Sequence, residues 1–120
     1  CPCGSGHPFR ICCEPLHRRS RKAATALQLM RARYSAFATA DGDFLSWTWH
    51  PRTRPLPLDL AADQVWLGLN VLRTEQGGHR DTTGVVEFVA HFCIGERVGS
   101  VHETSRFERL EGRWVYVAEA

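Results

Sequence analysis

The sequence contains almost no lysine and no long hydrophobic run. Lys22 is the only lysine among 15 basic residues, a ratio that we attribute to genome composition and not to nucleic-acid binding. No apolar stretch approaches the roughly 18 residues of a membrane-spanning helix, so we expect no membrane contact. The net charge is only +2, and the overall charge therefore favours no class of partner.

Two common catalytic signatures are also missing. The chain has no G-x-x-x-x-G-K phosphate-binding loop and no serine nucleophile elbow with Asp and His partners. No signal-peptide pattern is visible, and we expect a reducing cytoplasm, which suits free thiolates. The chain is 43% hydrophobic, with four Trp and six Phe, so it has the material for an ordinary globular core.

The most informative residues present are four cysteines within the first thirteen positions. Cys1, Cys3, Cys12 and Cys13 follow the spacing C-x-C-x8-C-C. Two close pairs joined by a short turn can supply the four tetrahedral ligands of one Zn²⁺, and the glycines of Gly4-Ser5-Gly6 allow the turn. Such a site has no open coordination position, so its Zn²⁺ would be structural and would not activate water.

Two alternatives to zinc remain at this point. A disulfide cluster is one, although adjacent cysteines such as Cys12 and Cys13 are hard to bridge without strain. The fifth cysteine, Cys93, also argues against a fully paired framework. Reduced thiols without a metal are the other alternative.

The charge is distributed unevenly along the chain. Residues 1–34 hold seven basic and one acidic side chain, a net charge of +6, whereas residues 35–120 carry a net charge of −4. Four thiolates around one Zn²⁺ leave a formal charge of −2, which offsets part of this excess. A basic segment of this kind can meet phosphate or an acidic protein surface, or it can be a solvated linker.

The first half of the chain shows helical periodicity. Apolar residues recur every three or four positions between Ala23 and Ala38, which predicts a helix that buries Leu27, Met30, Tyr34 and Phe37. Asp41 or Asp43 could cap a short second helix. Residues 58–63 are predicted to form one further helical turn.

The second half has the alternation of β-strands. Val65, Leu67, Leu69 and Val71 alternate with their neighbours, and further strands are predicted over 85–94, 100–110 and 113–117. Glu111-Gly112 predicts a hairpin turn. Helices followed by an antiparallel meander indicate an α+β fold.

Several segments carry a resemblance to known families. Residues 1–13 resemble the SEC-C motif, the zinc knuckle also found at the C-terminus of the SecA translocation motor, with Phe9 where the motif commonly has Tyr. Five further segments resemble the bacterial YchJ-like family: LMRARYSAF (29–37), TWHPRTRP (48–55), GVVEFVAHF (84–92), HETSRF (102–107) and GRWVYV (112–117).

This resemblance implies a fold and a metal but no particular reaction. We expect a SEC-C-like zinc knuckle and basic connector over residues 1–19, with Cys1, Cys3, Cys12 and Cys13 as ligands. Residues 20–120 would form a middle domain similar to nuclear transport factor 2 (NTF2-like). In that fold, N-terminal helices pack on a curved antiparallel sheet to form a cone.

Cones of this kind often hold a pocket, so polar residues near it are candidates for a site. For ligand binding the candidates are Arg33, Tyr34, His50 and Arg106. For acid–base catalysis they are His50, His102, Glu87 and Glu103, because burial tunes His and carboxyl pKa values. Alternatively, the strand residues pair with one another on the solvent face, and His50 is buried against backbone.

Two functions follow from these features. The first is a cytoplasmic zinc-binding adaptor whose knuckle docks on a protein or ribonucleoprotein partner; direct nucleic-acid binding is possible but not favoured. The second is a small-molecule enzyme that uses His and Glu in the cone pocket. A pocket with convergent His and carboxylate side chains would support the enzyme, and a filled cone with an exposed basic arm would support the adaptor.

Overall fold

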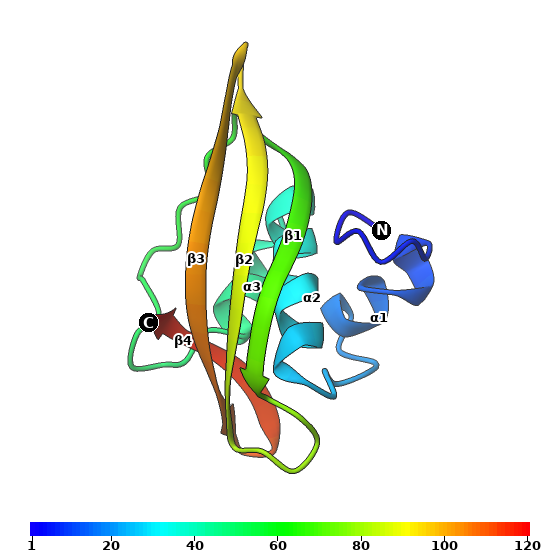
Figure 1. The fold of residues 1–120 in the computed structure, drawn as a ribbon, viewed down its shortest axis with the longest axis vertical. Coiled ribbons are helices and arrows are strands. Elements are labelled where there is room, and N and C mark those ends of the chain that lie inside the picture. The colour runs from blue at the N-terminus through cyan, green and yellow to red at the C-terminus, as the bar shows by residue number, and fades with distance from the viewer.

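The computed structural model describes residues 1–120 and shows helices packed on one face of a curved antiparallel sheet (Figure 1). The strands pair in the order β1-β2-β3-β4, so each strand lies beside its neighbour in sequence. This architecture confirms the predicted α+β fold. The strands span β1 Gln64–Gln76, β2 Thr83–Ile94, β3 Arg97–Leu110 and β4 Arg113–Glu119.

The helices occupy the first half of the chain. They are a 3₁₀ turn η1 Phe9–Ile11, α1 Glu14–His17, α2 Ala26–Thr39 and α3 Gly42–Trp47. The longest, α2, has 14 residues, and no helix is long and apolar enough to cross a membrane.

The α2 helix begins three residues later than the apolar pattern predicts. Thr25 Oγ1 accepts a hydrogen bond from Gln28 N at 3.1 Å, and Gln28 Oε1 accepts one from Ala24 N at 2.6 Å. This Thr-x-x-Gln arrangement satisfies backbone N–H groups that the first helical turn leaves free. The helix ends at Thr39, and the capping residue after it, Ala40, adopts a left-handed conformation with φ of 59°.

We expect Thr25→Ala to lower the free energy of unfolding by about 1 kcal/mol, because the mutant leaves the Gln28 N–H unsatisfied. Urea denaturation measures the change. Thr25→Ser is the control, since serine keeps the capping oxygen and should lose much less. Equal losses in both variants would show that the methyl group and not the cap matters.

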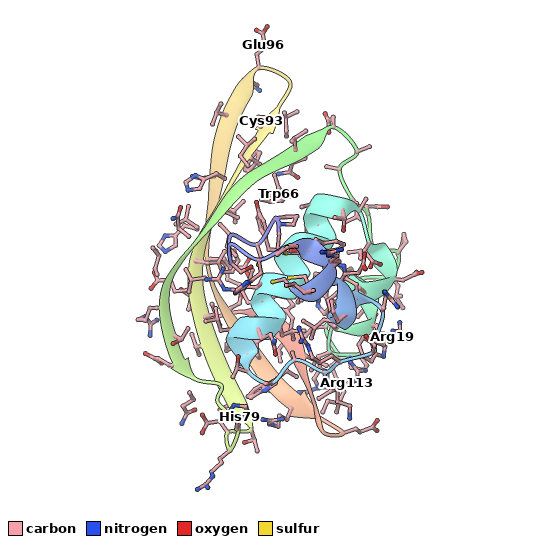
Figure 2. The ribbon with its side chains drawn as sticks, turned by 90° about the vertical axis from the view of Figure 1, so that its right-hand side faces the viewer. Arg19, Trp66, His79, Cys93, Glu96 and Arg113 are labelled. Atoms are coloured by element: carbon pink, nitrogen blue, oxygen red, sulfur yellow. The ribbon has the colours of Figure 1, made fainter.

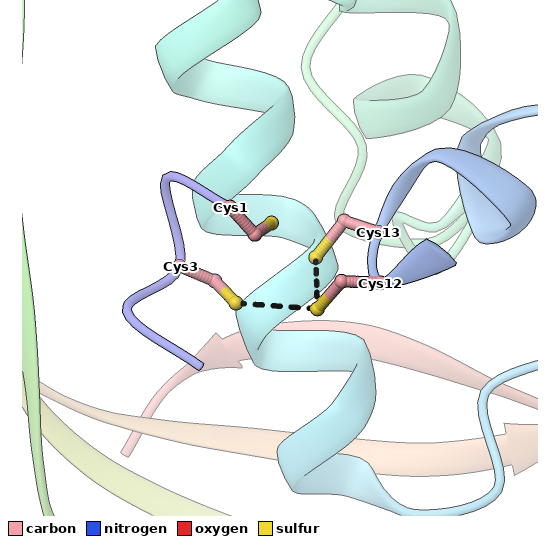
Figure 3. A group of neighbouring side chains, drawn as sticks. All are labelled: Cys1, Cys3, Cys12 and Cys13. Atoms are coloured by element: carbon pink, nitrogen blue, oxygen red, sulfur yellow. Dashed lines mark hydrogen bonds between the residues drawn. The ribbon is translucent and has the colours of Figure 1, made fainter. Parts of the chain in front are cut away.

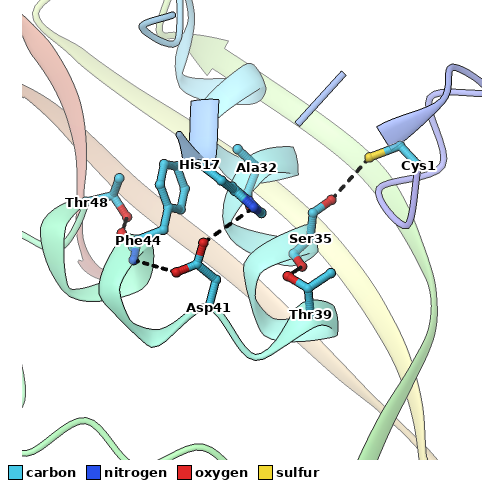
Figure 4. Close-up of polar contacts among 8 residues, drawn as sticks. All are labelled: Cys1, His17, Ala32, Ser35, Thr39, Asp41, Phe44 and Thr48. Carbon is cyan, nitrogen blue, oxygen red and sulfur yellow. Dashed lines mark hydrogen bonds and ion pairs between the residues drawn. The ribbon is translucent and has the colours of Figure 1, made fainter. Parts of the chain in front are cut away.

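The segment around α3 confirms one prediction and corrects another. Asp41 caps α3 by accepting from Phe44 N at 3.1 Å (Figure 4). The predicted helical turn over residues 58–63 is wrong: the chain there is irregular up to β1. Pro57 stands where that turn would need a capping side chain, and it has no acceptor to offer.

Two β-bulges in β1 change which side chains face the helices. The register with β2 shifts between Trp66 and Gly68 and again between Val71 and Arg73. Because each extra residue turns the following side chains to the other face, Trp66 faces the core together with Leu69 and Val71. The uninterrupted alternation predicted from Val65 to Leu72 is therefore wrong.

The core lies between α2 and the concave face of the sheet. Met30 and Tyr34 are buried as predicted, whereas Leu27 and Phe37 are only half-buried. The helix is also buried on its opposite side, where the segment from Cys1 to His17 covers it (Figure 1). For this reason small residues are buried there as well: Ala32, Ser35 and Ala36.

Candidate metal centre and cone cavity

The four N-terminal cysteines converge on one point beside α2 (Figure 3). Their sulfur atoms all lie within 4.8 Å of one another. Cys12 Sγ is 3.7 Å from Cys3 Sγ and 3.9 Å from Cys13 Sγ. A tetrahedron with Zn–S bonds of about 2.3 Å has S···S edges of about 3.8 Å. The cluster therefore has the dimensions of a four-thiolate metal site, and the distances are far too long for disulfides.

Local backbone geometry brings the two pairs together. Gly4 and Gly6 have φ values of 81° and 85°, a left-handed conformation that glycine adopts without strain. The chain then passes through η1, and Cys13 lies at the N-terminal end of α1. The glycine turn predicted between the pairs is thus present.

Two of the four thiols, those of Cys3 and Cys13, are buried, and burial by itself opposes their ionisation. Burial raises the pKa of Cys13 to about 12. At Cys3 burial is the largest single influence and raises the pKa, but hydrogen bonds with Ser5, Cys12 and Cys13 together lower the pKa of that thiol below its usual value. A compact set of buried thiolates is stable only beside a cation. The donor set, with four soft sulfurs and no oxygen ligand, fits Zn²⁺.

The carbonyl groups of the cysteine-bearing segment accept hydrogen bonds from two arginines, of which Arg31 lies on α2 and Arg21 precedes that helix. Arg31 Nη1 donates to Cys3 O at 2.7 Å, and Arg21 Nη2 donates to Cys12 O at 3.1 Å. Cys1 Sγ also lies 3.4 Å from Ser35 Oγ on α2 (Figure 4). The knuckle and the helix therefore form a continuous packed unit, with Cys3, Cys13 and Leu16 in the main hydrophobic cluster.

His17, the last residue of α1, is a buried contact of the knuckle. Its side chain is 6% exposed. Nε2 donates to Ala32 O at 2.8 Å, and the ring packs against Phe44 at 4.6 Å between centroids (Figure 4). His17 is therefore part of the packed knuckle.

A second feature is a cavity of about 200 Å³ between α2 and the sheet, which we call the cone cavity. Nine of its twelve lining residues are hydrophobic. Among the predicted ligand-binding residues, Arg33 and Tyr34 line it, and among the predicted catalytic residues, Glu103 does. His50, His102, Glu87 and Arg106 do not.

His102 and Glu87 lie on the outer, solvent-facing side of the sheet. His102 Nε2 is 2.7 Å from Glu87 Oε2, and Arg73 Nε donates to Glu87 Oε1 at 3.2 Å. These hydrogen bonds, first that of His102 and then that of Arg73, hold the pKa of Glu87 below its usual range. Arg106 is on the same face and exposed. The alternation along β2 and β3 explains this, because Val86 and Phe107 take the inward positions.

His50 is buried against backbone. Its backbone N–H donates to Tyr116 O at 2.8 Å, and its ring Nδ1 accepts from Arg52 N at 3.1 Å. The bond to Tyr116 O joins the segment after α3 to β4, whereas the bond from Arg52 N is local. The expected convergence of His50 and His102 on the cavity is not found, so the acid–base hypothesis loses both of its histidines.

Sequence reasoning missed several residues that complete the cavity. Tyr116 and Ser105 both donate hydrogen bonds to Glu103, and Trp49 and Trp66 contribute to the walls. The alternation along β3 could have identified Ser105, because Glu103 and Ser105 lie on the same face of the strand as the core residue Phe107. No sequence signal identifies the tryptophans, because bulges and loops decide their direction.

Comparison with protein-family models gives two matches. The model described as YchJ, middle NTF2-like domain, matches residues 25–119. The SEC-C motif model matches residues 1–15. Together they cover nearly the whole chain, and each match falls on the part that the structure shows as knuckle or cone.

Individual proteins resemble the chain over almost its full length. A UPF0225 protein of Streptomyces coelicolor is 48% identical over 97% of this chain and 90% of its own length. A UPF0225 protein of Chromobacterium violaceum is 49% identical over 98% of this chain and 90% of its own length. The solution structure of a SEC-C motif containing protein from Rhodopseudomonas palustris has a TM-score of 0.88 at 36% identity, covering 100% of this chain and 96% of the other. A crystal structure of a SEC-C motif containing protein from Psychrobacter arcticus has a TM-score of 0.78 at 27% identity, covering 98% of this chain and 79% of the other.

Proposed function

The chain belongs to the YchJ-like family of SEC-C motif proteins, and from this premise we propose that it is a zinc-dependent adaptor of the reducing cytoplasm. Cys1, Cys3, Cys12 and Cys13 would hold one structural Zn²⁺. The knuckle, fastened to α2, would help to present a basic surface to an anionic protein or ribonucleoprotein partner.

The observation that carries the docking proposal is a cluster of unpaired cations around Trp47. The guanidinium groups of Arg19 and Arg113 each lie 4.2 Å from the centre of the Trp47 ring. Figure 2 labels both arginines, one from the connector and one from the start of β4. Arg21 and Lys22 line the same shallow hollow. We call Arg19, Arg21, Lys22 and Arg113 the basic surface.

The charges of the basic surface are not neutralised within the protein. None of its four residues forms an ion pair with a carboxylate, whereas the neighbouring Arg18 pairs with Glu14 at 3.5 Å. Burial, followed by the charges of Arg19 and Arg54, lowers the pKa of Arg113. Crowded like charges cost free energy that an anionic partner would recover. This surface is therefore a better candidate for docking than the outer face of the sheet, where Glu87 already pairs with Arg73 and His102.

Charge reversal at two exposed positions tests the proposal. Arg21 is unsuitable because it holds knuckle carbonyl groups, and Arg18 is already paired. Arg19 and Lys22 are exposed and donate to no protein carbonyl or carboxylate. In affinity capture, Arg19→Glu/Lys22→Glu should lose a partner that the wild type retains at low salt, and higher salt should release that partner from the wild type.

The matched control is Arg80→Glu/Arg97→Glu, which makes the same charge change at two exposed positions, one in the β1–β2 connection and one at the start of β3. It should capture the same partners as the wild type. If all three proteins capture the same set at every salt concentration, the basic surface is a solvated face and the adaptor proposal fails.

A further inference from the structure

The cone cavity contains a buried cation with unused hydrogen-bond donors. Arg33 is only 4% exposed. Its Nη1 donates to Leu45 O at 3.0 Å and to Thr48 Oγ1 at 2.7 Å. Its Nε and Nη2 donate to no protein group, and no carboxylate forms an ion pair with it. Burying a charged group with unmet hydrogen bonds is costly, and Arg33 lines the cavity, so a ligand there would be stabilised by accepting from these nitrogens.

The same cavity contains an acceptor with unused capacity. Glu103 Oε2 accepts from the Tyr116 hydroxyl at 3.1 Å and also from the Ser105 hydroxyl. Oε1 of the same carboxylate accepts from no protein group. Glu103 and Arg33 therefore offer one free acceptor and two free donors to one cavity, and their formal charges cancel.

The remaining wall is aromatic. The Trp66 ring centre is 5.9 Å from that of Tyr34 and 6.0 Å from that of Phe37. On the other side of the cavity, Trp49 and Tyr116 meet edge to face at 5.1 Å, with the Arg33 guanidinium 4.9 Å and 4.7 Å from their ring centres. Flat rings pack favourably against such walls. The volume of about 200 Å³ is below the roughly 300–1,000 Å³ typical of drug-sized ligands, so only a small molecule fits.

We propose that the cone cavity binds a small, neutral, planar heteroaromatic molecule whose edge carries a carbonyl oxygen beside an N–H group. The carbonyl oxygen accepts from Arg33, the N–H donates to Glu103 Oε1, and the ring lies among the aromatic walls. A cationic ligand would meet Arg33, and a carboxylate would meet Glu103, so the cavity disfavours net charge of either sign. The proposal is independent of the adaptor function, because the cavity lies on the sheet side of α2 and the basic surface does not border it.

The cyclic amide carbostyril is a suitable probe, since it is flat and has the required carbonyl and N–H on one edge. In NMR titrations it should shift the indole N–H signals of Trp49 and Trp66, which line the cavity, and leave those of Trp47 and Trp114 unchanged. N-methylcarbostyril lacks the donor and should bind about tenfold more weakly. Three results would overturn the proposal: equal binding of naphthalene, tighter binding of naphthoate, or no binding by any of the four compounds up to the solubility limit.

A conservative substitution tests the role of Glu103. Glu103→Gln keeps the shape of the side chain but weakens the acceptor, and it should reduce carbostyril affinity about tenfold. Glu87→Gln is the same change on the outer face of the sheet and should leave the affinity unchanged. Equal affinity in wild type and both variants would contradict the assigned contact. The comparison with N-methylcarbostyril uses the wild-type protein, so it decides the question even if Glu103→Gln does not fold.

Discussion

Replacing Cys3 with serine is expected to abolish metal binding and to release the knuckle from α2. The Cys3 side chain is fully buried, its sulfur lies 3.7 Å from that of Cys12, and its carbonyl accepts from Arg31. Structural zinc contributes about 10–16 kcal/mol of apparent binding free energy in zinc-finger peptides. Since η1 and α1 together have only seven residues, we expect this segment to lose its fold without the metal.

Native mass spectrometry measures the outcome directly. The wild type should carry one zinc per chain, and Cys3→Ser should carry almost none. The control is Cys93→Ser, which changes the one cysteine outside the cluster and should keep full occupancy. Zinc binding by Cys3→Ser at the wild-type level would refute the four-cysteine site, and a wild type free of zinc but rich in another metal would refute the choice of ion.

The loss of zinc should also be visible at a distance from the site. Ala32 and Ser35 of α2 have 0% exposure because the knuckle covers them, and their backbone amides should exchange faster with solvent in Cys3→Ser. The amides of β2 and β3 should remain protected, since β2 pairs with β3 along its full length. Uniform exchange throughout the chain would instead show that the zinc supports the whole fold.

Leu45→Ala should lower the free energy of unfolding by about 2–5 kcal/mol, because it removes buried methyl groups and leaves a cavity. Leu45 on α3 is 0% exposed. Its carbonyl, which accepts from Arg33, is unaffected by the change of side chain. Urea denaturation of the zinc-loaded protein gives the value.

The chain offers a matched control for this substitution. Leu56, in the loop before β1, is 86% exposed, and Leu56→Ala should change the free energy of unfolding by no more than about 0.5 kcal/mol. Similar losses in the two variants would contradict the placement of α3 against the core.

The features that could be predicted from the sequence are those encoded over short stretches. The C-x-C-x8-C-C spacing with its glycine turn identified the four residues that converge in the structure. The helical period around Met30 and Tyr34 located α2, and the Glu111-Gly112 turn located the last hairpin. Each of these depends on backbone conformations that a few neighbouring residues determine.

The tertiary structure alone decided which polar residues meet. The bulge that follows Trp66 puts Leu69 and Val71 on the same face as Trp66, and the pairing of β2 with β3 placed Glu103 inside and His102 outside. Arg19 and Arg113 meet at Trp47 although they are 94 positions apart in sequence. A strand's alternation says which residues share a face but not which face is buried, and that choice depends on the helices packed against it. The sequence therefore determined the fold class and the four cysteines that converge, whereas the cavity and the basic surface arise from contacts between distant segments.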